Sequence, residues 1–448
     1  MTDPADLGVV DALELLARRA LSSRELVEAC LARIRERDGV HSHDGDPASV
    51  NAWVRVYEED ARAAAERADE RRACGGAPLL CGIPIGLKDL YAVAGKPLTA
   101  SSRVLDEVPT RDCDVWARFA AEGMVLLGHL HTHEFAAGGG TDQVGNPWDL
   151  ALSPGGSSGG SAAALASGQT PAATGTDTAG SLRIPSTDCG TSTIKPARGL
   201  VSIRGIVPLA STFDHAGPMA RTVADCEPLL AAMSGIRPRE TRRKLRRVAV
   251  SPRVRDLDPD VAGGFERALA QLPLVDVPPP EVQLDVGLLF FDLVTTEMLA
   301  WHRRFDDRRA LYRPSVRSFL EHAENRAMGA QEYANAQQQR IEDAWRWQDW
   351  LAEHRIDAIV EPTVPVLAHP RGHGYDAGFA DEEVISLTHM WDWTGFPVVA
   401  LPSGVGSRSG IPTGVSLIGA PGSEWNLLAW GAALQGELGV PEPGTVSP

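Results

Sequence analysis

Two serine clusters in glycine-rich backbone are the part of this chain best suited to chemistry. They lie within residues 155–161 and 175–185 and contain Ser157 and Ser181. Glycine allows a ligand to come close to main-chain N–H groups. N–H groups that converge on one point form an oxyanion hole, which stabilises the charge that develops when a serine attacks a carbonyl. The clusters therefore predict a nucleophilic serine beside an oxyanion hole.

A serine nucleophile needs a base, and neither cluster contains a histidine. Lys88 follows the apolar run 82–87, which predicts a buried strand. Burial disfavours the charged form of lysine and lowers its pKa, and a neutral amine can accept a proton. Because serine–lysine pairs are an established variant of the catalytic triad, we expect Lys88 to be the general base.

The two clusters resemble the signature of the amidase signature family. The matching residues are Gly-Gly-Ser-Ser-Gly-Gly-Ser at 155–161 and Gly-x-Asp-x-Ala-Gly-Ser-Leu-Arg-Ile-Pro at 175–185. Segments 82–89, 146–149, 217–225 and 394–397 are similar to the family's other motifs, so the resemblance covers most of the chain. Members of this family are serine hydrolases of amide bonds with a Ser–cis-Ser–Lys triad.

The resemblance implies a role for each signature residue. Ser181 would be the nucleophile, Ser157 the proton relay after a cis peptide bond, and Lys88 the general base and later the acid. The backbone of Thr178, Ala179, Gly180 and Ser181 would form the oxyanion hole. Hydrogen bonds from Ser158, Asp177 and Arg183 would hold the loops in place.

One residue of the signature departs from the family pattern. Ala179 stands where the family usually has glycine. A positive φ would strain alanine, whereas an ordinary φ would leave its methyl group narrowing the oxyanion hole. All three triad positions are filled, so we expect hydrolysis of a carboxylic amide to carboxylate and ammonia or amine through an acyl-enzyme on Ser181. The reaction needs no metal and no organic cofactor.

The substrate pocket is less well defined by the sequence. The resemblance places His133 and Phe135 in the pocket wall, and His389 and Trp391 either in this wall or in the core. Residues 285–336 and 385–393 are expected to shape the pocket. Their side chains do not specify which small-molecule amide is the substrate.

Three closely spaced histidines raise an alternative mechanism. His129, His131 and His133 follow the apolar residues 124–127, and histidines two apart at a strand end can share a zinc ion. A zinc-dependent amidohydrolase that used His129 and His131 would also hydrolyse amides, by a metal-bound hydroxide. That fold needs further ligands on eight similar strand–helix units, and the later histidines show no such rhythm.

A second alternative concerns assembly. The chain resembles, more distantly, the glutamine-hydrolysing component of a tRNA-dependent amidotransferase, which works with partner proteins. Hydrolysis of simple amides by the purified chain alone would distinguish an independent amidase from such a component.

Composition limits the class of partner and the compartment. The formal net charge of −16 argues against direct binding to nucleic acid or to an anionic membrane. The six cysteines are scattered without disulfide or metal-site spacing, and the N-terminus lacks the pattern of a signal peptide. We therefore expect a cytoplasmic protein. The sequence does not specify the oligomeric state and is compatible with a homo-oligomer.

The catalytic residues must be positioned by alternating strands and helices. Strands are expected at 79–87, 124–127, 358–360, 396–401 and 414–418, and helices at 58–73, 115–121, 161–166, 331–353 and 424–438. Ser22 and Glu25 form a predicted capping box, and residues 244–250 and 268–277 suggest one more strand–helix–strand unit. This pattern predicts an α/β fold. The resemblance implies a large mixed sheet flanked by helices in a single domain over residues 1–448, with a helical segment (1–75), a catalytic core (76–235) and a substrate-shaping part of the same sheet (236–448).

Overall fold

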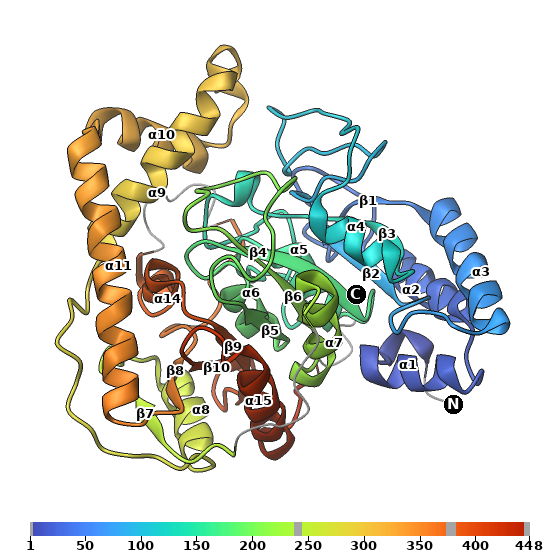
Figure 1. Ribbon diagram of the computed structural model, residues 1–448. Coiled ribbons are helices and arrows are strands. Elements are labelled where there is room, and N and C mark those ends of the chain that lie inside the picture. The colour runs from blue at the N-terminus through green and yellow to red at the C-terminus, as the bar shows by residue number, and fades with distance from the viewer. Residues whose placement is uncertain (1–2, 237–243, 373–381, 443–448) are drawn as a thin grey trace.

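The computed structural model describes residues 3–236, 244–372 and 382–442, and its centre is a ten-stranded sheet (Figure 1). The strand order is β1-β3-β2-β4-β6-β5-β9-β10-β8-β7. Strand β2 is parallel to β3 and β4, and β7 is parallel to β8, whereas the other neighbouring pairs are antiparallel. The mixed sheet with its flanking helices confirms the predicted fold class.

The strands come from all parts of the chain, and β1 lies within residues 1–75, the segment expected to be helical. They are β1 (Trp53–Val56), β2 (Pro84–Lys88), β3 (Val125–Leu130), β4 (Ala172–Asp177), β5 (Ser192–Lys195), β6 (His215–Ala220), β7 (Val248–Val250), β8 (Ala358–Pro362), β9 (Val398–Val405) and β10 (Pro412–Ile418). The α-helices are α1 (Val9–Ala17), α2 (Ser23–Arg37), α3 (Glu58–Cys74), α4 (Asp114–Ala121), α5 (Gly159–Ala166), α6 (Arg183–Cys189), α7 (Val223–Ser234), α8 (Pro259–Leu269), α9 (Gly287–His302), α10 (Pro314–Arg326), α11 (Ala330–Glu353), α13 (Glu382–Ile385), α14 (His389–Thr394) and α15 (Glu424–Leu438). Short 3-10 helices are η1 (Pro4–Asp6), η2 (Glu134–Ala136) and η3 (Arg303–Leu311).

A local sequence signal accounts for the start of α2. The Ser22 hydroxyl accepts a hydrogen bond from the Glu25 N–H at 3.1 Å, and the Glu25 carboxylate accepts one from the Ser22 N–H at 2.8 Å. This reciprocal pair satisfies backbone donors that the first turn of α2 leaves open and confirms the predicted capping box.

The strand expected within residues 268–277 is reduced to a single bridge in the structure. The segment before Val277 pairs with the sheet only at the bridge between Leu274 and Val248. The prolines at 278–280 follow immediately, and proline has no N–H to donate to a ladder. Helix α8 supplies the helix of the expected unit and ends at Leu269.

Helices surround the sheet on several sides. Helix α15 packs on α7 and α8, and these three helices cover β6, β9 and β10. Helices α5 and α6 pack on each other, and α5 covers β4 whereas α6 covers β5 and β9. In Figure 1, α9, α10 and α11 stand together at one side of the molecule, and α1 to α3 lie at the opposite end. Among the helices of the described residues, none has the length and apolar character that a membrane crossing requires.

The parallel pairing of β2 with β4 brings the two segments that carry the predicted catalytic residues together. Ile85 is in register with Ala172, and Gly86 with Ala173. Parallel strands end at the same edge of a sheet, so Lys88 and the turn that follows Asp177 lie at one edge. The backbone N–H of Lys88 donates to the Thr174 hydroxyl at 3.1 Å, which fixes this register.

Candidate active site

Lys88 ends strand β2, and its side chain is completely buried. The Nζ atom lies 2.8 Å from Ser157 Oγ, 2.8 Å from Ser158 Oγ and 2.9 Å from Thr176 Oγ1. Burial lowers the pKa of Lys88 well below its usual value, and the negative charge of Asp177 only partly opposes this. The site therefore favours a neutral amine at position 88.

The hydroxyl groups around Lys88 allow a definite arrangement of protons. The Ser158 hydroxyl has a carbonyl acceptor, Thr176 O at 3.3 Å, so its oxygen is free to accept from Nζ. A neutral amine has two N–H donors and one lone pair. With the two donors directed to Ser158 and Thr176, the lone pair faces the hydroxyl of Ser157, which can donate to it. Lys88 is thus placed to take a proton from Ser157.

The backbone holds Ser157 in this position. The Gly156–Ser157 peptide bond is cis. The Ser157 carbonyl accepts hydrogen bonds from the His133 N–H at 3.0 Å and from the Thr141 hydroxyl at 3.1 Å. Helix α5, buried along nearly all its length, begins two residues later and anchors the segment to the sheet.

Ser181 lies in the turn between β4 and α6, and its side chain opens onto a pocket. Its carbonyl accepts a hydrogen bond from the Ser158 N–H at 3.2 Å, which links the two serine clusters. Within the described residues, the hydroxyls of Ser157 and Ser181 do not share a hydrogen bond. Catalytic hydrogen bonds are often long before substrate binds, and rotation about one bond moves the Ser181 hydroxyl.

The turn before Ser181 has the properties of an oxyanion hole. The N–H groups of Ala179 and Ser181 have no acceptor in the part of the chain that the structure describes. The Gly180 N–H differs from the expectation, because it donates to Asp177 Oδ1 at 2.5 Å. Gly180 also takes the positive φ of the turn, at 132°, whereas Ala179 does not have a positive φ. Alanine is therefore unstrained at 179, and its methyl group lines the pocket.

Comparison with known proteins identifies the family of the chain. The family model described as Amidase matches residues 25–428. The chain belongs to the amidase family. It is 35% identical to the A component of the glutamyl-tRNA(Gln) amidotransferase of Roseiflexus sp. (strain RS-1), over 97% of each chain.

Solved structures of the same family have the same fold. The 6-aminohexanoate cyclic dimer hydrolase with its substrate has a TM-score of 0.85 and 25% identity, over 99% of this amidase and 100% of that chain. The A component of the glutamyl-tRNA(Gln) amidotransferase of Thermotoga maritima has a TM-score of 0.76 and 26% identity, over 99% of each.

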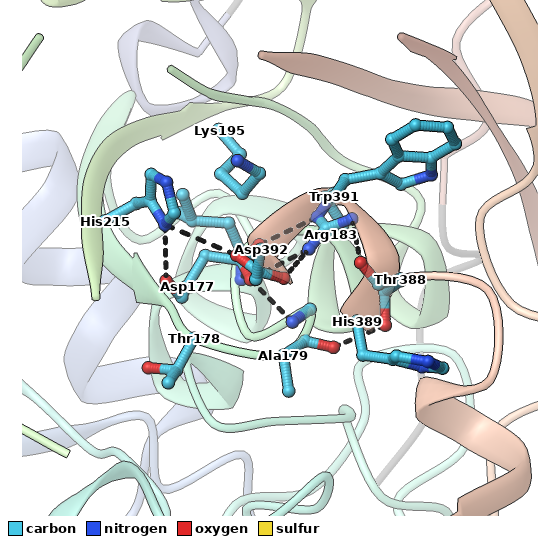
Figure 2. A network of polar contacts seen from close by, with 12 residues as sticks. Asp177, Thr178, Ala179, Arg183, Lys195, His215, Thr388, His389, Trp391 and Asp392 are labelled. Atoms are coloured by element: carbon cyan, nitrogen blue, oxygen red, sulfur yellow. Dashed lines mark hydrogen bonds and ion pairs between the residues drawn. The ribbon is translucent and has the colours of Figure 1, made fainter. Parts of the chain in front are cut away.

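A buried ionic network supports the turn before Ser181 in this amidase (Figure 2). The completely buried Arg183 donates from Nε to Asp177 Oδ2 at 2.9 Å and from Nη2 to Asp177 Oδ1 at 3.0 Å. Its Nη2 also lies 2.5 Å from Asp392 Oδ2, on α14. The resemblance predicts Asp177 and Arg183 as supports of the loops, but it does not predict Asp392. The carboxylate of Asp392 accepts the second N–H of Arg183 Nη2, which Asp177 leaves without an acceptor.

Two residues expected in the pocket wall lie elsewhere. His133 is buried, with Nδ1 3.3 Å from Glu134 O and Nε2 3.4 Å from Ser315 Oγ. Phe135 packs among other rings, including His302 at a centroid distance of 4.5 Å. Positive φ values at Phe135 and Ala136 turn the backbone there, and it is residues 136–139 that line the pocket at Ser181.

The two C-terminal candidates for the pocket wall, His389 and Trp391, lie in different surroundings. His389 lines an outer chamber next to the Ser181 pocket. Trp391 is completely buried; its ring packs on Trp347 at 5.1 Å, and its Nε1 donates to Glu361. Most of the remaining large side chains of the pocket wall come from α9 and α10, within the expected segment 285–336, and the others are Ile184, Leu209 and Ile385. The apolar run Leu-Leu-Phe-Phe at 288–291 is the sequence signal for it.

The three spaced histidines have other partners in the fold. His129 Nδ1 is 2.8 Å from the Tyr57 hydroxyl, and its Nε2 is 3.0 Å from Tyr91 O. His131 Nδ1 is 3.2 Å from Ser101 Oγ. Among the described residues, no group of three His, Cys, Asp or Glu side chains is arranged to hold a metal ion.

These contacts give a prediction for chelator treatment. Incubation with EDTA followed by gel filtration is expected to leave the rate of amide hydrolysis unchanged, because the rings at 129 and 131 are engaged in protein hydrogen bonds. Ammonia release before and after treatment measures the effect. Inactivation that zinc reverses would support the metal mechanism instead.

Proposed function

We propose that this chain hydrolyses a carboxylic amide to carboxylate and ammonia or amine through an acyl-enzyme on Ser181. The observation that supports this most strongly is the buried amine of Lys88, 2.8 Å from Ser157 Oγ at the edge of the sheet where Ser181 also lies. The oxyanion turn and membership of the amidase family support the same reaction.

Each step uses groups of this site. Ser181 Oγ attacks the amide carbon while its proton passes to Ser157, whose own proton passes to Lys88 Nζ. The N–H groups of Ala179 and Ser181 stabilise the oxyanion. As the C–N bond breaks, the proton returns from Lys88 through Ser157 to the leaving nitrogen. Water then attacks the acyl-enzyme by the same relay and releases the carboxylate.

We further propose that the chain acts without partner proteins on a small-molecule substrate in the cytoplasm. It binds no nucleic acid and is a monomer or a homo-oligomer. All six cysteines are free thiols, as expected in a reducing compartment. Similarity to the Roseiflexus amidotransferase component favours a second candidate, glutamine hydrolysis within an amidotransferase.

An acyl-enzyme trapping experiment tests the proposed function. The purified chain alone is mixed with a simple amide and quenched with acid, and the peptide carrying Ser181 is analysed by mass spectrometry. We expect the mass of the acyl group on Ser181 and release of ammonia in the same reaction. Activity that appears only with glutamine and only when partner proteins are added would favour the second candidate.

A further inference from the structure

The pocket onto which Ser181 opens has apolar walls. Its cavity volume is about 80 Å³, and it adjoins an outer chamber of about 710 Å³. Helices α9 and α10 supply most of its larger side chains. The larger apolar members of the wall are Ile184, Leu209, Phe290, Phe291, Val294, Phe319 and Ile385.

Aromatic contacts fix the shape of this wall. The rings of Phe291 and Phe319 meet edge to face at a centroid distance of 5.3 Å. Phe290 packs edge to face on Phe213 at 5.0 Å. Rings held by such contacts offer a preformed surface to another apolar or aromatic group.

Charged side chains begin only beyond this wall. The outer chamber shares Phe291 and Ile385 with the inner pocket and is lined by Arg255, Asp256 and Asp285, among others. In the inner pocket, the only polar side chain among the described lining residues is the Ser181 hydroxyl.

We infer that the acyl group of the substrate is bulky, apolar and uncharged next to the amide, as in an arylalkanoyl or medium-chain alkanoyl amide. This inference rests on the proposed function. Glutamine carries its ammonium and carboxylate groups a short spacer away from the amide carbon. They would be buried against phenylalanine rings with no counter-charge among the described lining residues, and taking an ion out of water without a partner is strongly unfavourable. An apolar acyl group gains free energy from the same burial.

A panel of primary amides tests the inference, since all of them release ammonia. With the full chain, kcat/KM for 3-phenylpropionamide is expected to exceed that for glutamine by at least about 100-fold and to exceed that for acetamide similarly. Protection of Ser181 from a fluorophosphonate label ranks the same amides without requiring turnover. Equal or better use of glutamine would overturn the substrate class but leave the serine mechanism in place. Absence of both labelling and hydrolysis would instead remove the proposed function.

Two variants locate the effect in the inner pocket. Phe319→Ala is expected to reduce kcat/KM for 3-phenylpropionamide about 10-fold and leave acetamide unaffected, and Val294→Leu narrows the same wall should the first variant not fold. Leu288→Ala is the control, since Leu288 lines the outer chamber and is 81% exposed. An equal loss for both amides, or an equal effect of Leu288→Ala, would contradict the assignment.

A separate observation concerns the peptide between Ala179 and Gly180. Its carbonyl, Ala179 O, accepts a hydrogen bond from the Thr388 hydroxyl, and its N–H donates to Asp177 (Figure 2). The Thr388 carbonyl in turn accepts from Arg183 Nη1 at 3.0 Å. Both polar groups of this peptide are therefore held by protein, whereas the N–H groups on either side have no protein acceptor in the described residues.

The geometry points to Thr388 as a positioning residue for the oxyanion hole. It approaches so closely that a Cβ on Gly180 would lie 2.5 Å from Thr388 Oγ1. If the Thr388 hydroxyl were removed, the Ala179–Gly180 peptide could rotate. The Ala179 and Ser181 N–H groups would then lose their common direction, which matters most when negative charge is on the substrate oxygen.

Thr388→Val removes the hydroxyl and keeps the shape of the side chain. We expect kcat to fall at least about 10-fold with KM little changed, and the affinity for a tetrahedral boronate adduct at Ser181 to fall in parallel. Thr388→Ser should restore the wild-type rate. Thr394→Val is the matched control, because its hydroxyl donates only within α14, to Met390 O at 3.0 Å. A normal kcat in Thr388→Val, or an equal loss in Thr388→Ser, would overturn the assignment.

Discussion

Ser181→Ala is expected to lower kcat/KM for any amide substrate by at least about 10⁴-fold. No other group in the turn offers an oxygen nucleophile at the pocket mouth, since the neighbouring turn residues are Ala179 and Gly180. The loss should appear in kcat, because the apolar wall that binds the acyl group stays intact. Ammonia release at saturating substrate measures it.

A matched serine variant distinguishes loss of the nucleophile from loss of folding. Ser161 lies in the same signature, is completely buried in α5 and donates to Thr174 O at 2.8 Å. Ser161→Ala should therefore lose some stability but retain most of its activity. If Ser181→Ala turned over substrate at the wild-type rate, the serine mechanism would be excluded.

Lys88→Met is expected to cause a loss of similar size, about 10⁴-fold in kcat/KM, because the relay then has no proton acceptor. In the wild type, kcat/KM should fall as the pH drops through the lowered pKa of Lys88, since only the neutral amine accepts a proton. The pH–rate profile at low substrate concentration measures this limb.

A second buried lysine serves as control for this variant. Burial lowers the pKa of Lys195 to about 7, and among the described residues the one hydrogen bond of its Nζ goes to a backbone carbonyl, Pro196 O at 3.4 Å. Lys195→Met should therefore retain most of the activity. Comparable losses in the two variants would mean that a buried lysine matters for folding and not for the relay.

The same lowered pKa makes a prediction for stability. Between the folded and unfolded pKa values of Lys88, the unfolded chain binds the proton and the folded chain does not. The free energy of unfolding therefore rises with pH across this window, up to the ordinary value near 10.5. In urea unfolding, the wild type should gain stability relative to Lys88→Met between about pH 7 and pH 9.5. A constant difference would indicate that Lys88 is charged in the fold.

Local sequence patterns predicted the elements that carry the proposed triad but not the contacts that support it. The capping box at Ser22 and the buried strand before Lys88 depend on neighbouring residues, so they could be inferred without a structure. Asp392 reaches Arg183 across 209 positions of the chain, and Thr388 reaches Ala179 across the same separation. No periodic pattern links such positions, because the topology of the fold alone brings them together.

The pocket wall shows a similar limit. The His-Glu-Phe segment lies beside the site, but positive φ values at Phe135 and Ala136 direct Phe135 into an aromatic cluster. Sequence does not assign a left-handed conformation to a phenylalanine, for which it is unfavourable. The sequence likewise could not show which N–H groups around Gly180 are free to bind an oxyanion. Only the backbone geometry shows that the Gly180 N–H faces Asp177.

An NMR titration of Lys88 tests most directly whether an uncharged amine stands at the start of the relay. Lysine labelled with ¹³C at Cε is incorporated into the full chain, and the Lys88 signal is identified by its loss in Lys88→Met. We predict a midpoint well below 10.5, so that this signal reports a neutral amine at a pH where exposed lysines are still charged. A signal that stays in the charged position until the ordinary lysine pKa would contradict the mechanism.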